Sequence, residues 1–233
     1  MEFARIAVGE GQPLHCVHCS SPAERSYRDA ATIGAEVDRA AAASADPTGP
    51  NVCLTGPEPF GHPELPRLGI ACRQAGARRI ALETDAAALS VRVNAAGLVA
   101  AGVHHLHVRI LHADEARGDE LGGGACRTRD SFAGIAGYLE AAEAAGVNAV
   151  VTLRVPVCEH NAASLPEIVT RAAALGVHAV RLLGTDRWPP SAPAFIGAAC
   201  DTGMVNGVWV EAAESLPVPD SHSLHIVGGG CDE

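Results

Sequence analysis

The sequence has few aromatic residues, no long apolar run and no excess of basic residues. Aromatic side chains make up only 3% of the 233 residues, whereas alanine is abundant in every stretch that favours a helix. No apolar run approaches the ~20 residues that a helix needs to span a bilayer, so we predict no membrane span. The formal net charge of −10 argues against binding to nucleic acid or to anionic lipid, because both need a basic face.

The amino-terminal segment does not favour export. Residues 1–8 are too short and carry a charge too early for a secretory signal, so we expect the protein in the cytoplasm. In that compartment the eight cysteines are expected to be mostly thiols. A closely spaced cysteine pair then indicates a metal or redox site before it indicates a disulfide.

Short apolar runs alternate with longer alanine-rich stretches along most of the chain. The predicted strands cover residues 3–8, 51–55, 79–83, 105–111, 149–155 and 179–183, with a further candidate at 208–210. The predicted helices cover residues 28–44, 63–75, 86–101, 131–145 and 165–175. This alternation predicts right-handed crossovers and a parallel sheet, and therefore a single α/β domain.

Four of the predicted helices end in the same way. Gly76, Gly102, Gly146 and Gly176 each stand just past an apolar helical stretch. Glycine at that position adopts the left-handed conformation without a steric penalty from Cβ, and the chain then turns into the next strand.

Two cysteines lie in the loop after the first predicted strand. Cys16 and Cys19 are separated by two residues, so one turn can bring both sulfurs to the same side, and His15 and His18 flank them. From these residues alone, zinc binding, thiol redox chemistry and an inert pair all remain open.

Two further motifs end the next two strands. Residues 53–59 read Cys-Leu-Thr-Gly-Pro-Glu-Pro, and residues 82–85 read Leu-Glu-Thr-Asp. With the cysteine loop, they resemble the radical S-adenosylmethionine (radical SAM) superfamily. That family has a C-x3-C-x2-C loop after strand one, a Leu-x-Gly-Gly-Glu-Pro turn after strand two and a Glu-Thr-Asn-Gly-like turn after strand three.

The resemblance implies a fold and a division of the chain. It implies an α/β fold, a partial (β/α)6 barrel of the radical SAM type over residues 1–184, with the cofactor at the carboxyl ends of the strands. Residues 185–233 would form a short C-terminal extension that ends in a flexible tail.

The resemblance also implies a [4Fe–4S] cluster and S-adenosylmethionine as cofactors. Cys16 and Cys19 would be two of the cluster ligands, with Gln12 in the position of the first ligand and His15 and His18 as possible substitutes. Residues contacting S-adenosylmethionine would be Gly56, Pro57 and Glu58 at its amino group, Thr84 and Asp85 at its ribose or carboxylate, and Arg154 at its carboxylate.

The sequence departs from the family pattern in the loops that carry the chemistry. Gln12 replaces a thiolate with an amide, which is a poor ligand for an iron cluster. Pro57 replaces the second glycine of its turn and removes a backbone N–H. The pair Asp85-Ala86 replaces Asn-Gly, which is a milder change.

Three functional hypotheses follow. The first is a radical SAM enzyme with altered ligation that modifies a small molecule or a peptide. The second is a catalytically lapsed member that acts as a binding or assembly partner of another protein, without a cluster. The third is a zinc-binding α/β domain that uses the two cysteines with His15 and His18, which leaves the other two motifs unexplained.

Overall fold

The computed structural model describes residues 3–11, 25–44, 46–123, 127–185, 188–213 and 216. Its main sheet has seven strands, all parallel, in the order β1-β4-β5-β6-β7-β8-β9. These strands are β1 (Ala4–Ala7), β4 (Asn51–Thr55), β5 (Arg79–Thr84), β6 (His105–Arg109), β7 (Val150–Pro156), β8 (Ala179–Leu183) and β9 (Trp209–Ala212). The short strands β2 (Gly9–Glu10) and β3 (Ser26–Tyr27) form a separate antiparallel pair.

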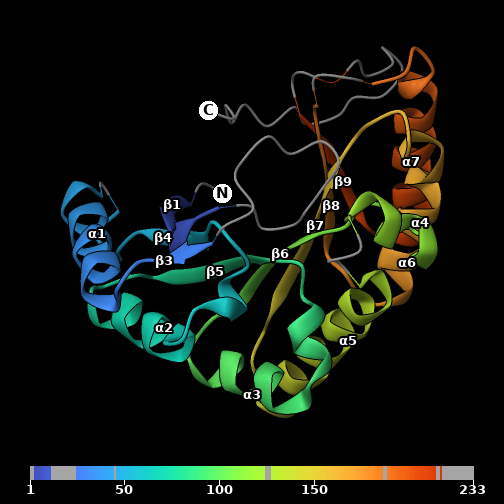
Figure 1. The fold of residues 1–233 in the computed structure, drawn as a ribbon. Helices are drawn as coiled ribbons and strands as arrows, with labels where there is room; N and C mark the ends of the chain where they lie inside the picture. The colour runs from blue at the N-terminus through green and yellow to red at the C-terminus, as the bar shows by residue number, and fades with distance from the viewer. Residues whose placement is uncertain are drawn as a thin grey trace.

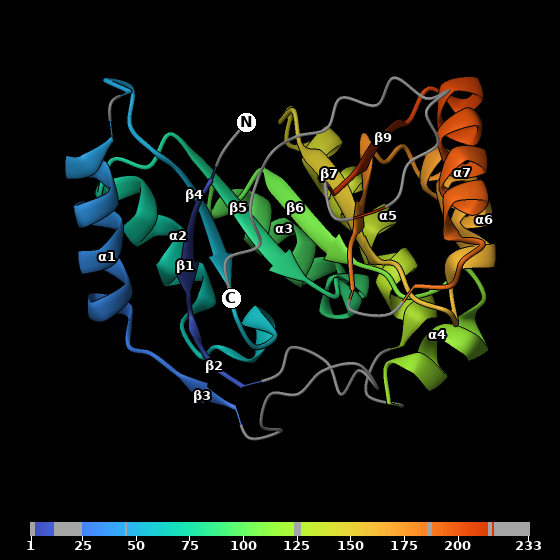
Figure 2. The same cartoon turned by 90° about the horizontal axis from the view of Figure 1, so that it is seen from above.

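The helices lie along one side of the main sheet. The α-helices are α1 (Ala30–Ala43), α2 (Leu65–Gln74), α3 (Arg92–Ala100), α4 (Glu115–Leu121), α5 (Thr128–Ala144), α6 (Leu165–Ala174) and α7 (Ala192–Asn206). Three 3-10 turns are η1 (Pro59–Gly61), η2 (Ala87–Ser90) and η3 (Ala162–Ser164). Figure 1 shows the helices in an arc around the convex side of the curved sheet, and Figure 2 shows the strands side by side from β1 to β9.

Alternation along the strands gives the sheet an apolar face and a polar face. In β6, Leu106 and Val108 are fully buried, whereas His105, His107 and Arg109 are only partly covered. Successive side chains of a strand point to opposite faces, so the apolar set faces the helices and the polar set faces the concave side. The core therefore lies between the sheet and the helices.

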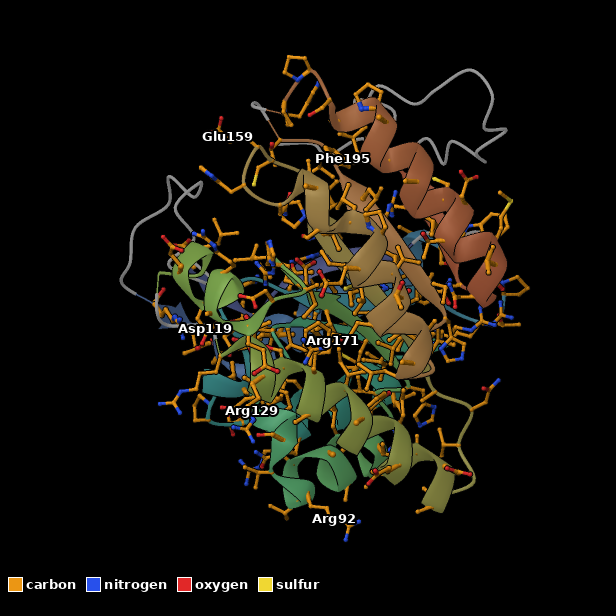
Figure 3. The ribbon with its side chains drawn as sticks, turned by 90° about the vertical axis from the view of Figure 1, so that its right-hand side faces the viewer. Arg92, Asp119, Arg129, Glu159, Arg171 and Phe195 are labelled. Atoms are coloured by element: carbon orange, nitrogen blue, oxygen red, sulfur yellow. The ribbon has the colours of Figure 1, made fainter. Side chains whose placement is uncertain are left out.

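Long-range contacts of single side chains tie the helices to this core. The buried hydroxyl of Tyr138 in α5 donates to the carbonyl of Val103 at 2.9 Å. Arg171 in α6 lies 3.7 Å from the centre of the Phe132 ring and donates to Ala113 and Glu115 at 2.6 and 2.8 Å. Figure 3 shows Arg171 near the middle of the side of the molecule where α4, α5 and α6 meet.

The predicted α/β fold with a parallel sheet is confirmed. All six strands predicted for the core are present, and β9 adds a seventh at the position of the further candidate. The four glycines expected after helices have positive φ angles of 87°, 85°, 67° and 76°, as their predicted conformation requires. In the sheet order β1 and β9 stand at opposite edges, so the described strands form an open, partial barrel.

The division of the chain at residue 184 stays a prediction. The described part of the extension adds α7 and β9, and β9 pairs in parallel with β8. Among the residues that the structure describes, no helix is both long and apolar enough to cross a membrane.

Candidate functional site

The predicted metal ligands lie outside the described residues. These are Gln12, His15, Cys16, His18 and Cys19. The chain on both sides of this segment is described, because β2 precedes it and β3 follows it, and Gly9 pairs with Tyr27. The backbone N–H of Arg28 also donates to the carbonyl of Val8 at 2.9 Å, which holds the chain on both sides of the segment at the end of β1.

The turn after β4 packs against the base of that segment. Gly56 has a φ of 115°, and a Cβ there would lie 3.0 Å from the carbonyl oxygen of Gly9. Only glycine accommodates both this conformation and this approach. The carbonyl of Glu58 accepts a hydrogen bond from the Tyr27 hydroxyl at 2.8 Å, so β3 also holds the turn in place.

Glu58 joins this turn to the turn after β5. Its Oε1 accepts from the Thr84 hydroxyl at 2.6 Å, and its Oε2 accepts from the backbone N–H of Asp85 at 2.9 Å. The side chain also caps η1 by accepting from the N–H of Phe60 at 3.3 Å. Both carboxylate oxygens are therefore used within the protein, and the predicted contacts Glu58, Thr84 and Asp85 form one network.

Burial makes this network sensitive to protonation. Burial, helped by the negative charge of Asp85, raises the pKa of Glu58 to about 7. Burial also raises the pKa of Asp85, although its hydrogen bond from the N–H of Ala87 and the charge of Arg109 oppose the shift. Two neighbouring buried carboxyl groups cannot both ionise cheaply, so the pair holds a proton nearer to neutral pH than free carboxyl groups would.

The turn after β5 needs a left-handed residue at position 86. Ala86 has a φ of 63°, and it is the one residue other than glycine with a positive φ in the described ranges. This is the position at which the family motif has glycine. The α5 helix packs tightly against the turn, since a Cβ on Gly134 would lie 1.9 Å from the Ala86 carbonyl oxygen.

A second polar cluster lies on the concave face around Glu83. Its Oε2 accepts from Arg154 at 2.6 Å and from Arg5 at 2.9 Å, and its Oε1 lies 3.8 Å from Nε of Arg109. Burial raises the pKa of Glu83, but the charges of Arg109, Arg154 and Arg5 outweigh burial and hold the pKa below its usual value. Burial lowers the pKa of Arg154, while the charge of Glu83 raises it.

Arg154 was the one member of this cluster assigned a role from the sequence. Arg5, Glu83 and Arg109 were missed as its partners because they lie on other strands. Strand alternation would place Arg109 on the same face as His105 and His107, but it does not reveal the neighbours across the sheet.

Cys53 and His107 form a buried pair on the same face. The sulfur of Cys53 lies 3.6 Å from Nδ1 of His107, and the Phe3 ring packs edge-on against His107. Burial, with the nearby charge of Glu83, raises the pKa of the thiol to about 12, and burial with the charge of Arg154 lowers that of His107 to about 4. At neutral pH the pair is a thiol and a neutral imidazole.

The described residues offer no ready-made metal site. No group of three or more histidine, cysteine, aspartate or glutamate side chains in the described ranges could hold a metal ion. The carboxyl ends of β4 to β7 present instead a buried acidic network beside an arginine cluster. This arrangement suits a zwitterion, in which an amino group and a carboxylate need opposite charges.

Comparisons with known proteins bear on the family and the fold. The sequence profile of the Radical SAM superfamily matches residues 6–181. No curated protein matches the sequence.

Solved structures share the fold at low sequence identity. The Streptococcus suis protein SuiB, bound to S-adenosylmethionine, is similar with a TM-score of 0.70 and 12% identity, over 89% of this chain and 49% of that one. AnSMEcpe with bound AdoMet has a TM-score of 0.65 and 12% identity, over 91% of this chain and 64% of that one.

A third structure is the methyltransferase TsrM from Kitasatospora setae, with cobalamin and a [4Fe–4S] cluster bound. It has a TM-score of 0.56 and 16% identity, over 77% of this chain and 36% of that one. The chain thus spans between about a third and two thirds of the length of these structures.

Proposed function

Because this chain belongs to the radical SAM superfamily, we propose that it binds S-adenosylmethionine at the carboxyl ends of β4 and β5 and acts in the radical-type modification of a substrate. The observation that carries the proposal is the buried network of Glu58, Thr84 and Asp85. This network joins the two turns that resemble the cofactor-binding turns of the family. A buried pair of carboxyl groups with shifted pKa values is also typical of a functional site.

The described residues fit S-adenosylmethionine. The carbonyl groups of the turn that begins at Gly56 would receive its amino group, because Pro57 has no N–H to offer. Asp85 would contact the ribose or help to hold the amino group. Arg154 has a buried Nε with no acceptor among the described residues, and this donor would bind the carboxylate.

The fit to a [4Fe–4S] cluster is incomplete. Such a cluster supplies the electron that cleaves the sulfonium and produces a carbon radical. Cys16 and Cys19 would hold two of its irons, but the first position of the motif is the amide of Gln12. The sequence of the loop thus offers two thiolates instead of three.

We propose a peptide as the substrate, with a small metabolite as the other candidate. SuiB, which shares the fold, has been solved in complex with its precursor peptide SuiA. Among the described strands, β1 and β9 each pair with one neighbour only, and a peptide could bind in extended form along such an edge.

A second candidate function is a binding or assembly partner without a cluster. The specific observation in its favour is the loss of chemistry at two motif positions, Gln12 and Pro57, while the core of the fold is intact. In addition, both oxygens of Glu58 are already used by Thr84 and Asp85, which is what a structural role requires.

Anaerobic reconstitution tests these functions against each other. The full chain would be loaded with iron and sulfide, assayed for both, and reduced for electron paramagnetic resonance spectroscopy. For an enzyme we expect bound iron and sulfide that are lost in Cys16→Ala and kept in Cys200→Ala, whose cysteine lies in α7. Incubation with S-adenosylmethionine and a reductant should then release 5′-deoxyadenosine.

The variant Gln12→Cys restores the missing thiolate and provides the positive control. If the wild-type chain binds no iron while Gln12→Cys does, the second candidate replaces the first. One equivalent of zinc that is lost in Cys16→Ala would instead support the zinc-binding hypothesis.

A further inference from the structure

The concave face of the sheet carries more positive charge than its acidic residues neutralise. Its charged residues on the strands from β1 and from β5 to β9 include Arg5, Glu83, Arg109, Arg154, Arg181 and Glu211. Arg181 is balanced by Glu211, whereas the three arginines around Glu83, which are Arg5, Arg109 and Arg154, leave a local surplus of two positive charges. This surplus stands out in a chain whose formal net charge is −10.

The histidines of the same face add no charge at neutral pH. Burial lowers the pKa of His107 to about 4, and it lowers that of His105 as well. The surplus therefore comes from guanidinium groups, which stay protonated at any physiological pH.

Arg109 presents an unused pair of donors within this surplus. Its Nε and Nη2 are buried and have no hydrogen-bond acceptor among the residues that the structure describes. Glu83 does not accept a hydrogen bond from these two donors. Its Oε2 accepts from Arg5 and Arg154, while its Oε1 lies 3.8 Å from Nε of Arg109. That distance exceeds the range of an N–H···O hydrogen bond.

The two unused donors form one edge of the guanidinium. Nε–H and the neighbouring Nη2–H point in the same direction, at a spacing that matches the two oxygens of a carboxylate. Buried charged donors without acceptors cost free energy, so each such group in a native protein calls for a partner. The partner that fits this edge in charge and shape is a carboxylate.

We propose that Arg109 binds a carboxylate of the substrate side-on, through Nε and Nη2, at the carboxyl end of β6. The identity of the bound molecule as the substrate rests on the proposed function, whereas the binding itself needs no cluster. In the sheet Arg109 pairs with Arg154 and Arg154 pairs with Arg181. The site thus extends over β6 to β8.

The charge surplus explains why the cofactor does not exhaust this site. S-adenosylmethionine carries one carboxylate, which would pair with one of the two surplus charges, at Arg154, whereas its ammonium and sulfonium groups neutralise neither. The second charge, at Arg109, is left for an acidic side chain or the free carboxyl end of a peptide.

Binding of small carboxylates to the full chain tests the inference. One probe is N-acetyl-glutamate α-amide, with the neutral N-acetyl-glutamine amide as its matched control. A second pair, N-acetyl-alanine and its amide, stands for a chain end and separates the two sources of carboxylate. Affinities would be measured by calorimetry at constant ionic strength, and the Nε–H resonance of Arg109 would be followed by NMR.

Three arginine variants make the measurement specific. Arg109→Gln removes the charge and the two parallel donors Nε–H and Nη2–H. The loss of these charged hydrogen bonds should weaken binding of the preferred acidic probe about tenfold or more. Arg109→Lys keeps the charge without the side-on fork, so it should weaken binding by a smaller factor. Arg92→Gln is the control, because Arg92 is 90% exposed and lies on the outer surface, at the lower edge of Figure 3.

We expect an acidic probe to bind while its neutral control does not, to shift the Arg109 resonance, and to bind equally well with S-adenosylmethionine present. The inference is overturned if neither acidic probe binds, if Arg109→Gln binds as well as Arg92→Gln, or if S-adenosylmethionine displaces the probe. A chain that binds the probe but releases no 5′-deoxyadenosine contradicts the proposed function alone. A chain that releases it but binds no probe contradicts only the inference about Arg109.

Discussion

Replacement of Glu83 by glutamine tests the electrostatic centre of the concave face. Glu83 is one carboxylate among the guanidinium groups of Arg5, Arg109 and Arg154, and its side chain is only 10% exposed. Glutamine preserves the shape and one acceptor but removes the negative charge. The variant therefore leaves three cations together with no counter-charge.

The expected cost follows from the burial of the partners. Breaking a buried ion pair by removal of one partner costs roughly 3–5 kcal/mol. Arg109 and Arg154 are 15% and 14% exposed, but Arg5 is 54% exposed and its share is screened by water. We therefore expect a loss of about 3 kcal/mol, or roughly 6–12 °C in Tm for a chain of this size.

The pH dependence of the loss gives a second readout. The pKa of Glu83 is lowered in the folded state, so its stabilisation is complete above the unfolded pKa of about 4.3 and is lost as the pH falls through the folded value. Urea unfolding followed by circular dichroism should show a wide gap between wild type and Glu83→Gln at pH 7. The gap should narrow below about pH 4.

Glu140→Gln is the matched control for this experiment. Glu140 is 68% exposed and lies 3.7 Å from Arg92, so its loss should change stability by less than about 0.5 kcal/mol. The reasoning would be refuted if Glu83→Gln cost no more than Glu140→Gln at pH 7. A gap that stayed constant down to pH 3 would refute it equally.

Three further substitutions test the packing and the acidic network. Gly134→Ala should lower the free energy of unfolding in urea by about 1–3 kcal/mol, because its Cβ would meet the Ala86 carbonyl. In the control Gly97→Ala, in α3, the new Cβ meets nothing within 4 Å, so the variant should be more stable by up to about 1 kcal/mol. Equal effects of the two substitutions would contradict this. The raised pKa of Glu58 makes folding take up a proton, so the wild-type free energy of unfolding should fall as the pH rises from about 4.3 to about 7. In Glu58→Gln this fall should be absent. Parallel pH profiles of the two proteins would contradict the reasoning. Tyr138→Phe should lower the free energy of unfolding by roughly 1–2 kcal/mol, because the buried carbonyl of Val103 loses its donor. An unchanged urea midpoint would contradict this and show that water replaces the hydroxyl.

The sheet and most helices could be predicted because their signals are local. Alternating polar and apolar residues mark β6 and β7, and the glycines after α2, α3, α5 and α6 mark where those helices end. The α4 helix was not predicted, although Asp114 caps it by accepting from the N–H of Arg117 at 2.9 Å. Seven residues with a glycine inside give too weak a periodicity to stand out.

The residues in the turns after β4 and β5 could be predicted, but the ion pairs around Glu83 could not. The resemblance to the radical SAM superfamily implied that Glu58, Thr84 and Asp85 contact one ligand, and these residues do form one network. The bond from Arg5 to Glu83 joins residues 78 positions apart, and no local pattern carries such information. No local pattern reveals the donors of Arg109 that lack an acceptor either, because they depend on which arginines donate to the Glu83 carboxylate.

The order of the strands in the main sheet bears on how the protein is synthesised. Each strand of the main sheet from β4 to β9 pairs with the main-sheet strand that precedes it in the chain, so the sheet can grow while translation proceeds. Glu83 emerges 71 residues before Arg154, and of the described residues made before Arg154, Arg5 alone has a hydrogen bond to it. A nascent chain that stops short of β7 lacks the second hydrogen-bonded partner of this buried carboxylate, so the late strand β7 completes its neutralisation.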